Sequence, residues 1–527
     1  MKKILCAWVV WGVCACAWAA DKTLVFCAEG APEYMTPSFN STASSFDVMA
    51  HIYGRLVSLD LTTLQTVPSL AESWEISPDG LSYTFKLRRG VKWQSNRYFK
   101  PSRAFNADDV MFTFNRQWKS DHPYHSLGYG KYPYFSGLGL NQIIQDIVKL
   151  DDYTVKFVLN QPLAPFLSDL TMHWSAIQSA EYAQAMLKQG HPEIFDNEPL
   201  GTGAFILESY EKGKKLNFVA FDDFWRGRSK LDNLVFDITP DGTERWNKTR
   251  SGQCHVMTNP NPADLTSMRY TPSVKVMDQT GLNIGYMAFN LRKKPLDDLR
   301  VRKAITMSID KISLLRMAYR GTALPAVNPF PPAMWSYNND VEDPPYDIDA
   351  ARVLMKEAGY EKGLSLVLLA MPVQRPYMLN PMEVARIIKA ELEDINVKVD
   401  IQMPSWSNYV SQARKGEHDL MLYGWTADIV DPDNFLHTLL SCDSVGLNNL
   451  ASFCDATYED LVQRARLTTN KLERVRLYRD AQQRLKTQLP WYTIAHTVQY
   501  KIVRRGIKGI VINPVGRNYF YGVELGD

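Results

Sequence analysis

LSLVLLAMPVQRPYMLNPMEVARIIKAELEDINVKVDIQMPSWSNYVSQARKGEHDLMLYGW, residues 364–425, is the stretch that decides the fold. Its apolar patterns predict three strands, over residues 364–371, 397–401 and 420–425. Apolar side chains at helical spacing predict two helices between the strands, over residues 382–395 and 406–415. The order is strand, helix, strand, helix, strand. This order implies a parallel sheet with right-handed crossovers and therefore an α/β fold.

Two opposite charges follow neighbouring strands of this predicted sheet. Arg375 comes just after the first strand, and Asp428 comes just after the third. In open α/β sheets, ligands bind outside the carboxyl ends of the strands. We therefore expect Arg375 and Asp428 to face one crevice, as the cation and the anion of a binding site. The alternative is that both are solvated charges on loops.

The N-terminal half has a different organisation, in which short strands alternate with turns. Period-2 patterns predict strands over residues 82–87 and 154–159. Asn106 is a predicted helix cap, because apolar residues follow it at helical spacing on one face. A chain of 527 residues is also long for a single small core, so we expect two or more lobes.

The composition is that of a folded globular protein. With 45% hydrophobic and 22% charged residues, it excludes a disordered chain and a coiled coil. A formal net charge of +2 leaves no electrostatic footprint for nucleic acid. The sequence contains no GxxxxGK(S/T), GxSxG or HExxH pattern, which argues against a nucleotide site and against two common hydrolase types. Because carboxylates are abundant, a catalytic pair in an exported hydrolase stays open as an alternative.

The first residues have the pattern of a secretory signal peptide. Two lysines precede an uncharged, mostly apolar run over residues 4–16, and Ala17-Trp18-Ala19 offers small residues for cleavage. We expect cleavage after Ala19, so that residues 1–19 form the signal peptide. An uncleaved anchor and a lipoprotein modified at Cys16 are the alternatives. No later segment has about 18 consecutive uncharged apolar residues, so we expect the exported chain to be soluble.

Four cysteines remain after the signal peptide, at Cys27, Cys254, Cys442 and Cys454. An even number in an exported chain indicates disulfides, and four cysteines allow three pairings. A local Cys442–Cys454 bridge is one of them, and it leaves Cys27 with Cys254. The alternative is a metal site of His437 with Cys442 and Cys454, although the CxxC and HxxxH spacings of common metal sites are absent.

Blocks of sequence along the whole chain resemble a known family. The first blocks are LAESWE at residues 70–75, SPDG at 77–80 and YTFKLRRGVKW at 83–93. The further blocks, in chain order, are FNADDV at 105–110, PLGTG at 199–203, DFW at 223–225, PLDD at 295–298, VR at 301–302 and DPDNF at 431–435. By these blocks the chain resembles the peptide-class extracellular solute-binding proteins.

The resemblance implies a two-lobed α/β fold like that of periplasmic binding proteins, with a hinge and a ligand cleft between the lobes. Lobe I would comprise residues 20–281 plus 499–527, with an extra N-terminal subdomain inserted. Lobe II would comprise residues 282–498, and the chain would cross near Gly281 and Val498. The implied role is that of a periplasmic binding protein that is not an enzyme and needs no cofactor. It is expected to be a monomer that closes on its ligand and delivers it to the inner-membrane permease of an ABC transporter.

Within this class the chain is most similar to the dipeptide-binding members, at AMPVQRPY (residues 370–377) and GWTAD (residues 424–428). This similarity implies that Asp428 binds the α-ammonium group of a dipeptide and that Arg375 binds its α-carboxylate. It also implies that Cys27 pairs with Cys254, and Cys442 with Cys454. The other candidate ligand-contacting residues are Trp425, Thr426, Tyr377, Ser41, Thr42 and Ala43.

Several positions leave the side-chain preference and the ligand class open. Trp425 and Tyr377 are candidate pocket walls, because their rings are flat, stiff and amphipathic, but core packing is the alternative for both. Ala43 replaces a glycine that the family has beside the ligand. The block DDFWRG at residues 222–227 is also similar to the antimicrobial-peptide-binding members. Longer or antimicrobial peptides and haem are therefore alternative ligands, whereas a purely structural envelope protein fits poorly with a charge pair at strand ends.

Overall fold

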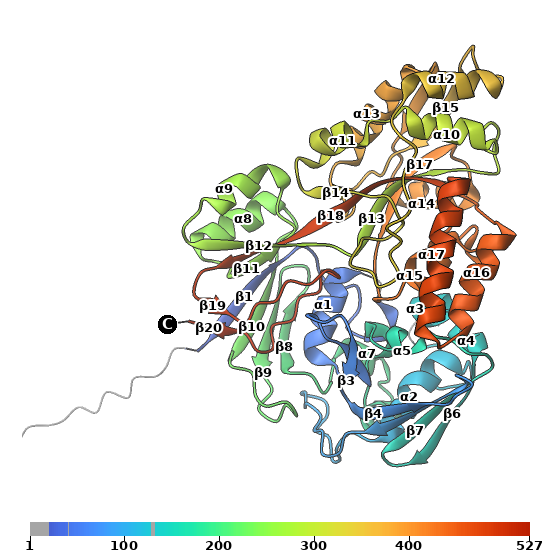
Figure 1. Cartoon of the computed structure of the whole chain (residues 1–527). Coiled ribbons are helices and arrows are strands. Elements are labelled where there is room, and N and C mark those ends of the chain that lie inside the picture. Colours follow the sequence, from blue (N-terminus) through green and yellow to red (C-terminus); the bar gives the residue numbers. More distant parts are fainter. Residues whose placement is uncertain (1–20, 41, 128–131, 527) are drawn as a thin grey trace, which may run out of the picture.

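Helices and strands mix along the chain, as the α/β prediction requires (Figure 1). The structure is a computed structural model, and it describes residues 21–40, 42–127 and 132–526. The predicted signal peptide, residues 1–19, and the candidate site residue Ser41 lie outside the described residues. Within the described ranges, no helix is long and apolar enough to cross a membrane.

Twelve of the described strands form one mixed sheet. Neighbouring strands follow the order β16-β15-β17-β13-β18-β11-β1-β10-β9-β8, and β12 and β14 also pair with β18. The strands are β1 (Thr23–Ala28), β8 (Phe205–Glu211), β9 (Lys215–Ala220), β10 (Asn233–Ile238), β11 (Val256–Thr258), β12 (Val274–Thr280), β13 (Asn283–Phe289), β14 (Ala323–Pro325), β15 (Leu364–Leu369), β16 (Val397–Gln402), β17 (Leu420–Thr426) and β18 (Trp491–Arg504).

The predicted strand and helix order over residues 364–425 is confirmed. β15 pairs in parallel with both β16 and β17, and the connecting helices are α13 (Pro381–Glu393) and α14 (Trp406–Lys415). The first strand ends at Leu369, two residues earlier than predicted. Leu369 pairs with Gln402, which is the last residue of β16. Beyond this pair, Pro372 has no N–H group that could donate the next hydrogen bond between the two strands. The carboxyl end of β15 therefore lies beside the start of β17, since Leu369 is opposite Met421, and β17 continues beyond it to Thr426.

One long strand, β18, belongs to two parts of the sheet (Figure 1). Its residues up to Thr497 pair with β13 and β14, and its residues from Val498 pair with β12 and β11. The Gly281 N–H, between β12 and β13, donates to the Thr497 carbonyl at 2.9 Å. The change of partner thus falls where the sequence predicts the chain crossings, at Gly281 and Val498. The lobe boundaries themselves stay a prediction.

A separate four-stranded sheet, in the order β4-β5-β7-β6, lies in the N-terminal half. Its strands are β4 (Ala71–Ile76), β5 (Ser82–Leu87), β6 (Ile144–Asp151) and β7 (Thr154–Leu159), and helix α2 (Ala107–Trp118) packs with it. The two strands and the helix cap predicted here are confirmed. The Asn106 side chain accepts from the Asp108 N–H, and the Asp109 carboxylate accepts from the Asn106 N–H, which is a capping box.

The remaining helices cover the sheets or connect them (Figure 1). Their bounds are α1 (Ala43–Ile52), α3 (Pro133–Gly137), α4 (Leu140–Ile143), α5 (Phe166–Asp169), α6 (Ala180–Lys188), α7 (Glu193–Asn197), α8 (Gly242–Ser251), α9 (Leu265–Arg269), α10 (Leu299–Met307), α11 (Lys311–Leu314), α12 (Ile348–Glu357), α15 (Asp433–Leu440), α16 (Ala456–Leu467) and α17 (Lys471–Gln488). Two short hairpins complete the described strands, β2 (Val57–Leu59) with β3 (Thr66–Pro68) and β19 (Ile507–Lys508) with β20 (Glu524–Leu525).

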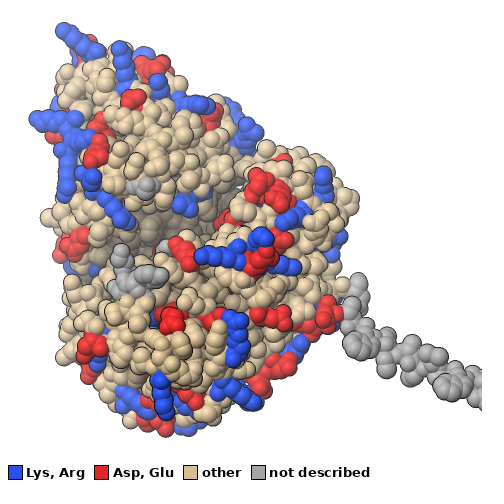
Figure 2. Space-filling model, turned by 180° about the vertical axis from the view of Figure 1, so that it is seen from behind, with Lys and Arg blue, Asp and Glu red and all other residues tan. Residues whose placement is uncertain are grey.

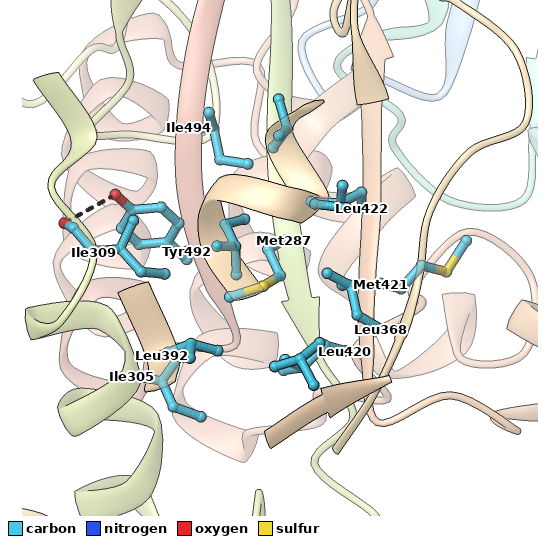
Figure 3. Packing of buried hydrophobic residues seen from close by; sticks show 14 of the residues in the cluster. Met287, Ile305, Ile309, Leu368, Leu392, Leu420, Met421, Leu422, Tyr492 and Ile494 are labelled. Carbon is cyan, nitrogen blue, oxygen red and sulfur yellow. Dashed lines mark hydrogen bonds between the residues drawn. The ribbon is translucent and has the colours of Figure 1, made fainter. Parts of the chain in front are cut away.

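The strands that lead to the predicted site are held by a dry core (Figure 3). Met287 of β13, Leu368 of β15 and Leu422 of β17 belong to one cluster of buried side chains, together with Ile305 from α10 and Leu392 from α13. All five side chains are completely buried. Because burying each such side chain contributes about 1.5–3 kcal/mol, this packing gives the strand ends a rigid base.

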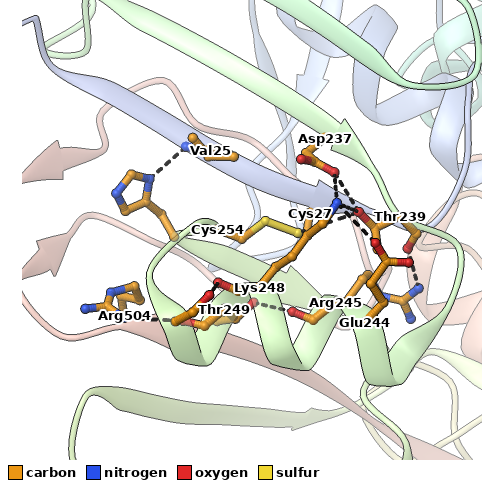
Figure 4. The surroundings of a disulfide bond; sticks show 12 residues. Val25, Cys27, Asp237, Thr239, Glu244, Arg245, Lys248, Thr249, Cys254 and Arg504 are labelled. Atoms are coloured by element: carbon orange, nitrogen blue, oxygen red, sulfur yellow. Dashed lines mark hydrogen bonds and ion pairs between the residues drawn. A yellow bond between two sulfur atoms is a disulfide. The ribbon is translucent and has the colours of Figure 1, made fainter.

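Both predicted disulfides are present. Cys27, in β1, is bonded to Cys254, which follows α8, and both residues are fully buried (Figure 4). Cys442 is bonded to Cys454, after α15. The metal alternative is therefore wrong, because Cys442 and Cys454 are bonded to each other and are not free thiolates. His437 Nε2 instead lies 2.9 Å from Arg466 Nη1.

Candidate ligand-binding site

The turn after β17 places Asp428, and one side chain holds that turn. Asn434, in the first turn of α15, accepts two hydrogen bonds at its Oδ1 atom. The Asp428 N–H donates at 2.9 Å, and the Trp425 indole N–H donates at 3.0 Å. The Ala427 N–H donates to the Leu282 carbonyl at 2.8 Å. The backbone around Asp428 is thus fixed by Asn434 and by Leu282, the residue before β13.

The Asp428 carboxylate is almost buried and meets groups from distant parts of the chain. Its side chain is 13% exposed. The Tyr134 hydroxyl, from α3, donates to Oδ1 at 3.1 Å, and Arg517 Nη2 lies 4.0 Å from the same oxygen. Burial raises the pKa of Asp428 above its ordinary value, and Arg517, Tyr134 and Asn434 oppose this shift. The carboxylate is therefore a partly satisfied anion in a low-dielectric setting.

Phe46, on α1, contacts Arg517 and Tyr134, and we call these residues together with Asp428 the Asp428 cluster. The Arg517 guanidinium lies over the Phe46 ring, 4.6 Å from its centroid. The His173 ring stacks on Phe46 at 4.9 Å, and the Tyr134 ring lies 5.8 Å from it. A cation over an aromatic face is attracted by the ring quadrupole, so Phe46 holds Arg517 in place beside Asp428.

Sequence reasoning missed Tyr134, Phe46 and Arg517. Each is an ordinary aromatic or cationic residue in its own segment, and Tyr134 and Asp428 are 294 positions apart in the chain. The predicted return of the C-terminal tail to the first lobe was the one available hint, and it did not single out Arg517.

Arg375 lies in a tight turn after β15. Its N–H donates to the Met378 carbonyl at 3.1 Å, and the Met378 N–H donates back to the Arg375 carbonyl at 2.9 Å. The guanidinium lies 4.5 Å from the centroid of the Trp406 ring, at the start of α14. Among the described residues it forms no ion pair. Arg375 is thus a half-buried cation with its charge unmatched by a carboxylate.

Tyr377 links the Arg375 turn to β17. Its ring packs so closely on Gly424 that a Cβ atom there would lie 2.2 Å from the ring. The Tyr319 hydroxyl donates to the Tyr377 carbonyl at 3.4 Å. Tyr377 is only 8% exposed and belongs to the large core cluster. The contact brings residues 375–378 alongside Trp425, whereas the role of the Tyr377 ring as a pocket wall stays a prediction.

Thr426 carries an unsatisfied polar group next to Asp428. The hydroxyl oxygen is buried and has no hydrogen-bond partner among the residues that the structure describes. Leaving a buried hydroxyl unpaired costs about 1–3 kcal/mol. A ligand or a water molecule that hydrogen-bonds to this hydroxyl would remove that cost. Trp425, one position earlier, is half-buried with its indole N–H already bonded to Asn434.

The other candidates, Thr42 and Ala43, start helix α1. Thr42 is the N-cap residue, and its N–H donates to Glu33 Oε2 at 3.1 Å. Both residues are exposed. They lie one turn before Phe46 and so belong to the same helix as this residue of the Asp428 cluster. Their contact with a ligand stays a prediction.

One face of the molecule has a hollow. On the face drawn in Figure 2, the surface is hollowed between two masses of the molecule, and both acidic and basic side chains border the hollow. Contacts also join segments that are far apart in the chain. Tyr134 meets Asp428, and the Ala164 N–H donates to the Arg466 carbonyl at 2.8 Å.

Comparison with known proteins agrees with the family that the sequence blocks indicate. The family model "Bacterial extracellular solute-binding proteins, family 5 Middle" matches residues 65–446. The chain is 45% identical over 506 residues to "Dipeptide-binding protein" of Escherichia coli (strain K12), covering 96% of this chain and 95% of that protein. It is 40% identical over 508 residues to "Heme-binding protein A" of Haemophilus influenzae (strain ATCC 51907 / DSM 11121 / KW20 / Rd), with coverage of 96% and 93%.

A solved structure extends the similarity to the whole fold. The dipeptide binding protein from Pseudoalteromonas sp. SM9913, in complex with Met-Leu, has a TM-score of 0.85 and 37% sequence identity. The match covers 95% of this chain and 100% of that chain. The resemblance seen in the ordered sequence blocks is therefore confirmed, and the chain belongs to the bacterial extracellular solute-binding proteins of family 5.

Proposed function

We propose that this protein captures dipeptides in the periplasm and delivers them to an ABC importer. One observation carries the proposal. A nearly buried carboxylate, Asp428, and a cation without an ion-pair partner among the described residues, Arg375, follow two strands that pair in parallel. The names of the relatives, which include a dipeptide-binding protein and a structure with Met-Leu, support the same ligand class.

The charge pair suits the two ends of a short peptide. A dipeptide is a zwitterion whose ammonium and carboxylate groups are separated by a short span. Asp428 can accept hydrogen bonds from the ammonium group, and the planar fork of Arg375 can bond the carboxylate in two places. An added residue would move one terminus away from its partner. The pair would therefore select for length as well as for charge.

Tolerance for different side chains needs weaker contacts. Water molecules can bridge ligand side chains and pocket walls without a fixed geometry. Trp425 and Thr426 are the candidates for these contacts on the β17 side, and Thr42 and Ala43 are the candidates at the start of α1. Tyr377 contributes by supporting the Arg375 turn.

Delivery requires that the protein close on the ligand and open again. The two crossings at Gly281 and at the junction of Thr497 with Val498 are suited to a hinge, because rigid-body rotation needs only a few residues to change conformation. An inner-membrane permease would then bind the surface of the closed, ligand-bound protein. The transporter supplies the energy, so the chain itself performs no reaction.

Calorimetric titration of ligand-stripped protein tests the proposal. The ligands are Ala-Ala, N-acetyl-Ala-Ala, Ala-Ala-amide and tri-alanine. We expect tight binding of Ala-Ala and much weaker binding of the other three, because each of them loses or displaces one charged terminus. Equal binding of all four would overturn the proposal that Asp428 and Arg375 bind the two charged ends of a dipeptide, and it would favour a site for longer peptides.

Haem is the second candidate, because one relative is named "Heme-binding protein A". Titration of the purified protein with haemin, followed by visible absorption, tests it. A saturable absorption change that Ala-Ala does not reverse would favour haem. An exported hydrolase would be supported only if the protein turned over a peptide and Asp428→Ala abolished that turnover.

A further inference from the structure

The Arg517 guanidinium has hydrogen-bonding capacity that the protein does not use. The side chain is only 13% exposed, yet none of its five N–H groups donates a hydrogen bond to a residue in the described part of the chain. Its nearest anion, Asp428 Oδ1, is 4.0 Å away, beyond hydrogen-bond distance. A nearly buried guanidinium without acceptors is costly, which indicates that an acceptor arrives from outside.

The direction of Arg517 is set by the fold. Its N–H donates to Asn513 Oδ1 at 3.1 Å, and its carbonyl accepts from Asn513 Nδ2 at 2.7 Å. The next residue, Asn518, is held by Asp47, which accepts from the backbone N–H at 2.9 Å and from the side-chain amide at 2.6 Å. Phe46 then supports the guanidinium from one side. Arg517 is thus held beside Asp428 before any ligand binds.

Arg517 is the charged side chain that offsets Asp428, and Asp47, another acid that acts on Arg517, is already hydrogen-bonded to Asn518. Asp428 contributes one negative charge and Arg517 one positive charge. His173 also stacks on Phe46, and burial lowers its pKa well below the ordinary value, so this imidazole adds no charge at neutral pH. An ammonium group on Asp428 would add a second positive charge. A second carboxylate near Arg517 would restore the balance.

We propose that Arg517 forms a subsite for an acidic side chain on the first residue of the ligand, so that dipeptides beginning with Asp or Glu bind best. This inference rests on the proposed function. In a peptide, the α-ammonium group and the first side chain are attached to the same carbon atom. If the ammonium group is at Asp428, the first side chain is therefore within reach of the cation beside Asp428. An arginine can bond a carboxylate in two places, which favours an acidic group over its amide.

Calorimetric titration with Ala-Ala, Glu-Ala, Gln-Ala and Lys-Ala tests the subsite. Glu-Ala and Gln-Ala have nearly the same shape and differ in charge. In the wild-type protein we expect Glu-Ala to bind about tenfold more tightly than Gln-Ala, since a charge-assisted hydrogen bond is about twice as strong as a neutral one. Lys-Ala should bind most weakly, because its side chain would meet Arg517.

Two variants separate the subsite from a structural role. In Arg517→Met, which keeps an extended side chain over Phe46, the preference for Glu-Ala over Gln-Ala should disappear, and Lys-Ala should improve relative to Ala-Ala. Arg517→Lys should keep part of the preference. The matched control is Arg476→Met, because Arg476 is 58% exposed on α17, and it should leave all ratios unchanged. The melting temperature of each variant shows whether it is folded.

The outcomes also separate this inference from the proposed function. If Ala-Ala binds but Glu-Ala and Gln-Ala bind equally to the wild-type protein, the acidic subsite is refuted and the dipeptide function stands. A preference that survives unchanged in Arg517→Met also refutes it. If a folded protein binds no dipeptide at all, the proposed function fails and the subsite fails with it.

Discussion

Asp428→Asn should weaken the binding of Ala-Ala by about 10²–10⁴-fold. Asparagine keeps the size of the side chain and one oxygen acceptor, so Tyr134 can still donate its hydrogen bond. What is lost is the negative charge that would face the ligand's ammonium group. The Asp428 side chain is 13% exposed, so the site is largely desolvated. Breaking a buried ion pair costs about 3–5 kcal/mol, and each 1.4 kcal/mol is about tenfold in affinity.

Arg517 adds to this effect. It lies 4.0 Å from the Asp428 oxygen, and after the substitution it has no carboxylate beside it. The incoming ammonium group would then meet a guanidinium without the intervening anion. The expected loss in affinity therefore lies toward the upper end of the range, while the loss in protein stability should be small because both side chains retain their packing.

The assay compares two ligands on two proteins. Calorimetric titration measures the affinity of Ala-Ala and of N-acetyl-Ala-Ala for the wild-type protein and for Asp428→Asn. The acetylated peptide has no ammonium group, so the substitution should change its affinity little. Asp460→Asn is a matched control, because Asp460 is 62% exposed on α16. Wild-type affinity of Asp428→Asn for Ala-Ala would refute the reasoning, as would an equal loss for both peptides.

Three further predictions concern the frame of the site. Gly424→Ala should lower the free energy of unfolding by about 1–3 kcal/mol or more, because the new Cβ atom would lie 2.2 Å from the Tyr377 ring and 2.3 Å from the Ile284 carbonyl oxygen. Urea unfolding measures this loss. Gly137→Ala is the control, because no atom lies within 4 Å of the Cβ atom that it adds. Arg474→Met should lower the free energy of unfolding by about 3–5 kcal/mol, since Arg474 and Asp431 form a two-point ion pair at 2.8 Å with side chains 6% and 5% exposed. An unchanged melting temperature would contradict this prediction. The contribution of His51, His418 and His496 to the free energy of unfolding should also fall as the pH drops from about 6.5 toward 4, because burial lowers the pKa of each to about 4 in the folded protein. Asp47 and Glu391 act in the opposite direction, since burial raises their pKa values to about 6 and about 7. The unfolded chain takes up the histidine protons near pH 6.5, so the contribution of each histidine, up to about 3 kcal/mol, is complete above that pH and is lost toward pH 4. Urea titrations of the wild-type protein and of His418→Gln between pH 7 and pH 4 measure the histidine contribution, because the wild-type protein should lose more stability toward pH 4 than the variant does.

Local pattern was enough for much of the fold. The strands β5 and β7 have the predicted bounds, and α2 begins at the predicted cap, because alternation and capping depend on residues within one turn or one strand. The strand and helix order of residues 364–425 also fixed which charges follow which strands. It could not show where β15 ends, because that depends on the end of its partner β16.

The candidate site was predicted in part. Arg375 and Asp428 became candidates because each follows a strand of one predicted sheet, and Trp425 and Thr426 became candidates because they adjoin Asp428; their contact with a ligand stays a prediction. The burial of Tyr377 against Gly424 was not predictable, since an aromatic residue in a loop has the same pattern whether it lines a pocket or fills a core. The strand β18, which pairs with both parts of the large sheet, was likewise visible only as a C-terminal crossing near Val498.

The amino-acid sequence by itself determined the local elements, the order of the parallel strands, the four cysteines and the family, because these depend on spacing along the chain. Only the tertiary structure brought Tyr134, Phe46 and Arg517 to Asp428, across 294 residues between Tyr134 and Asp428 alone. No periodicity links such distant segments. Their meeting is decided by how the buried faces of the sheets and helices pack, and this packing sets the charge that surrounds the carboxylate.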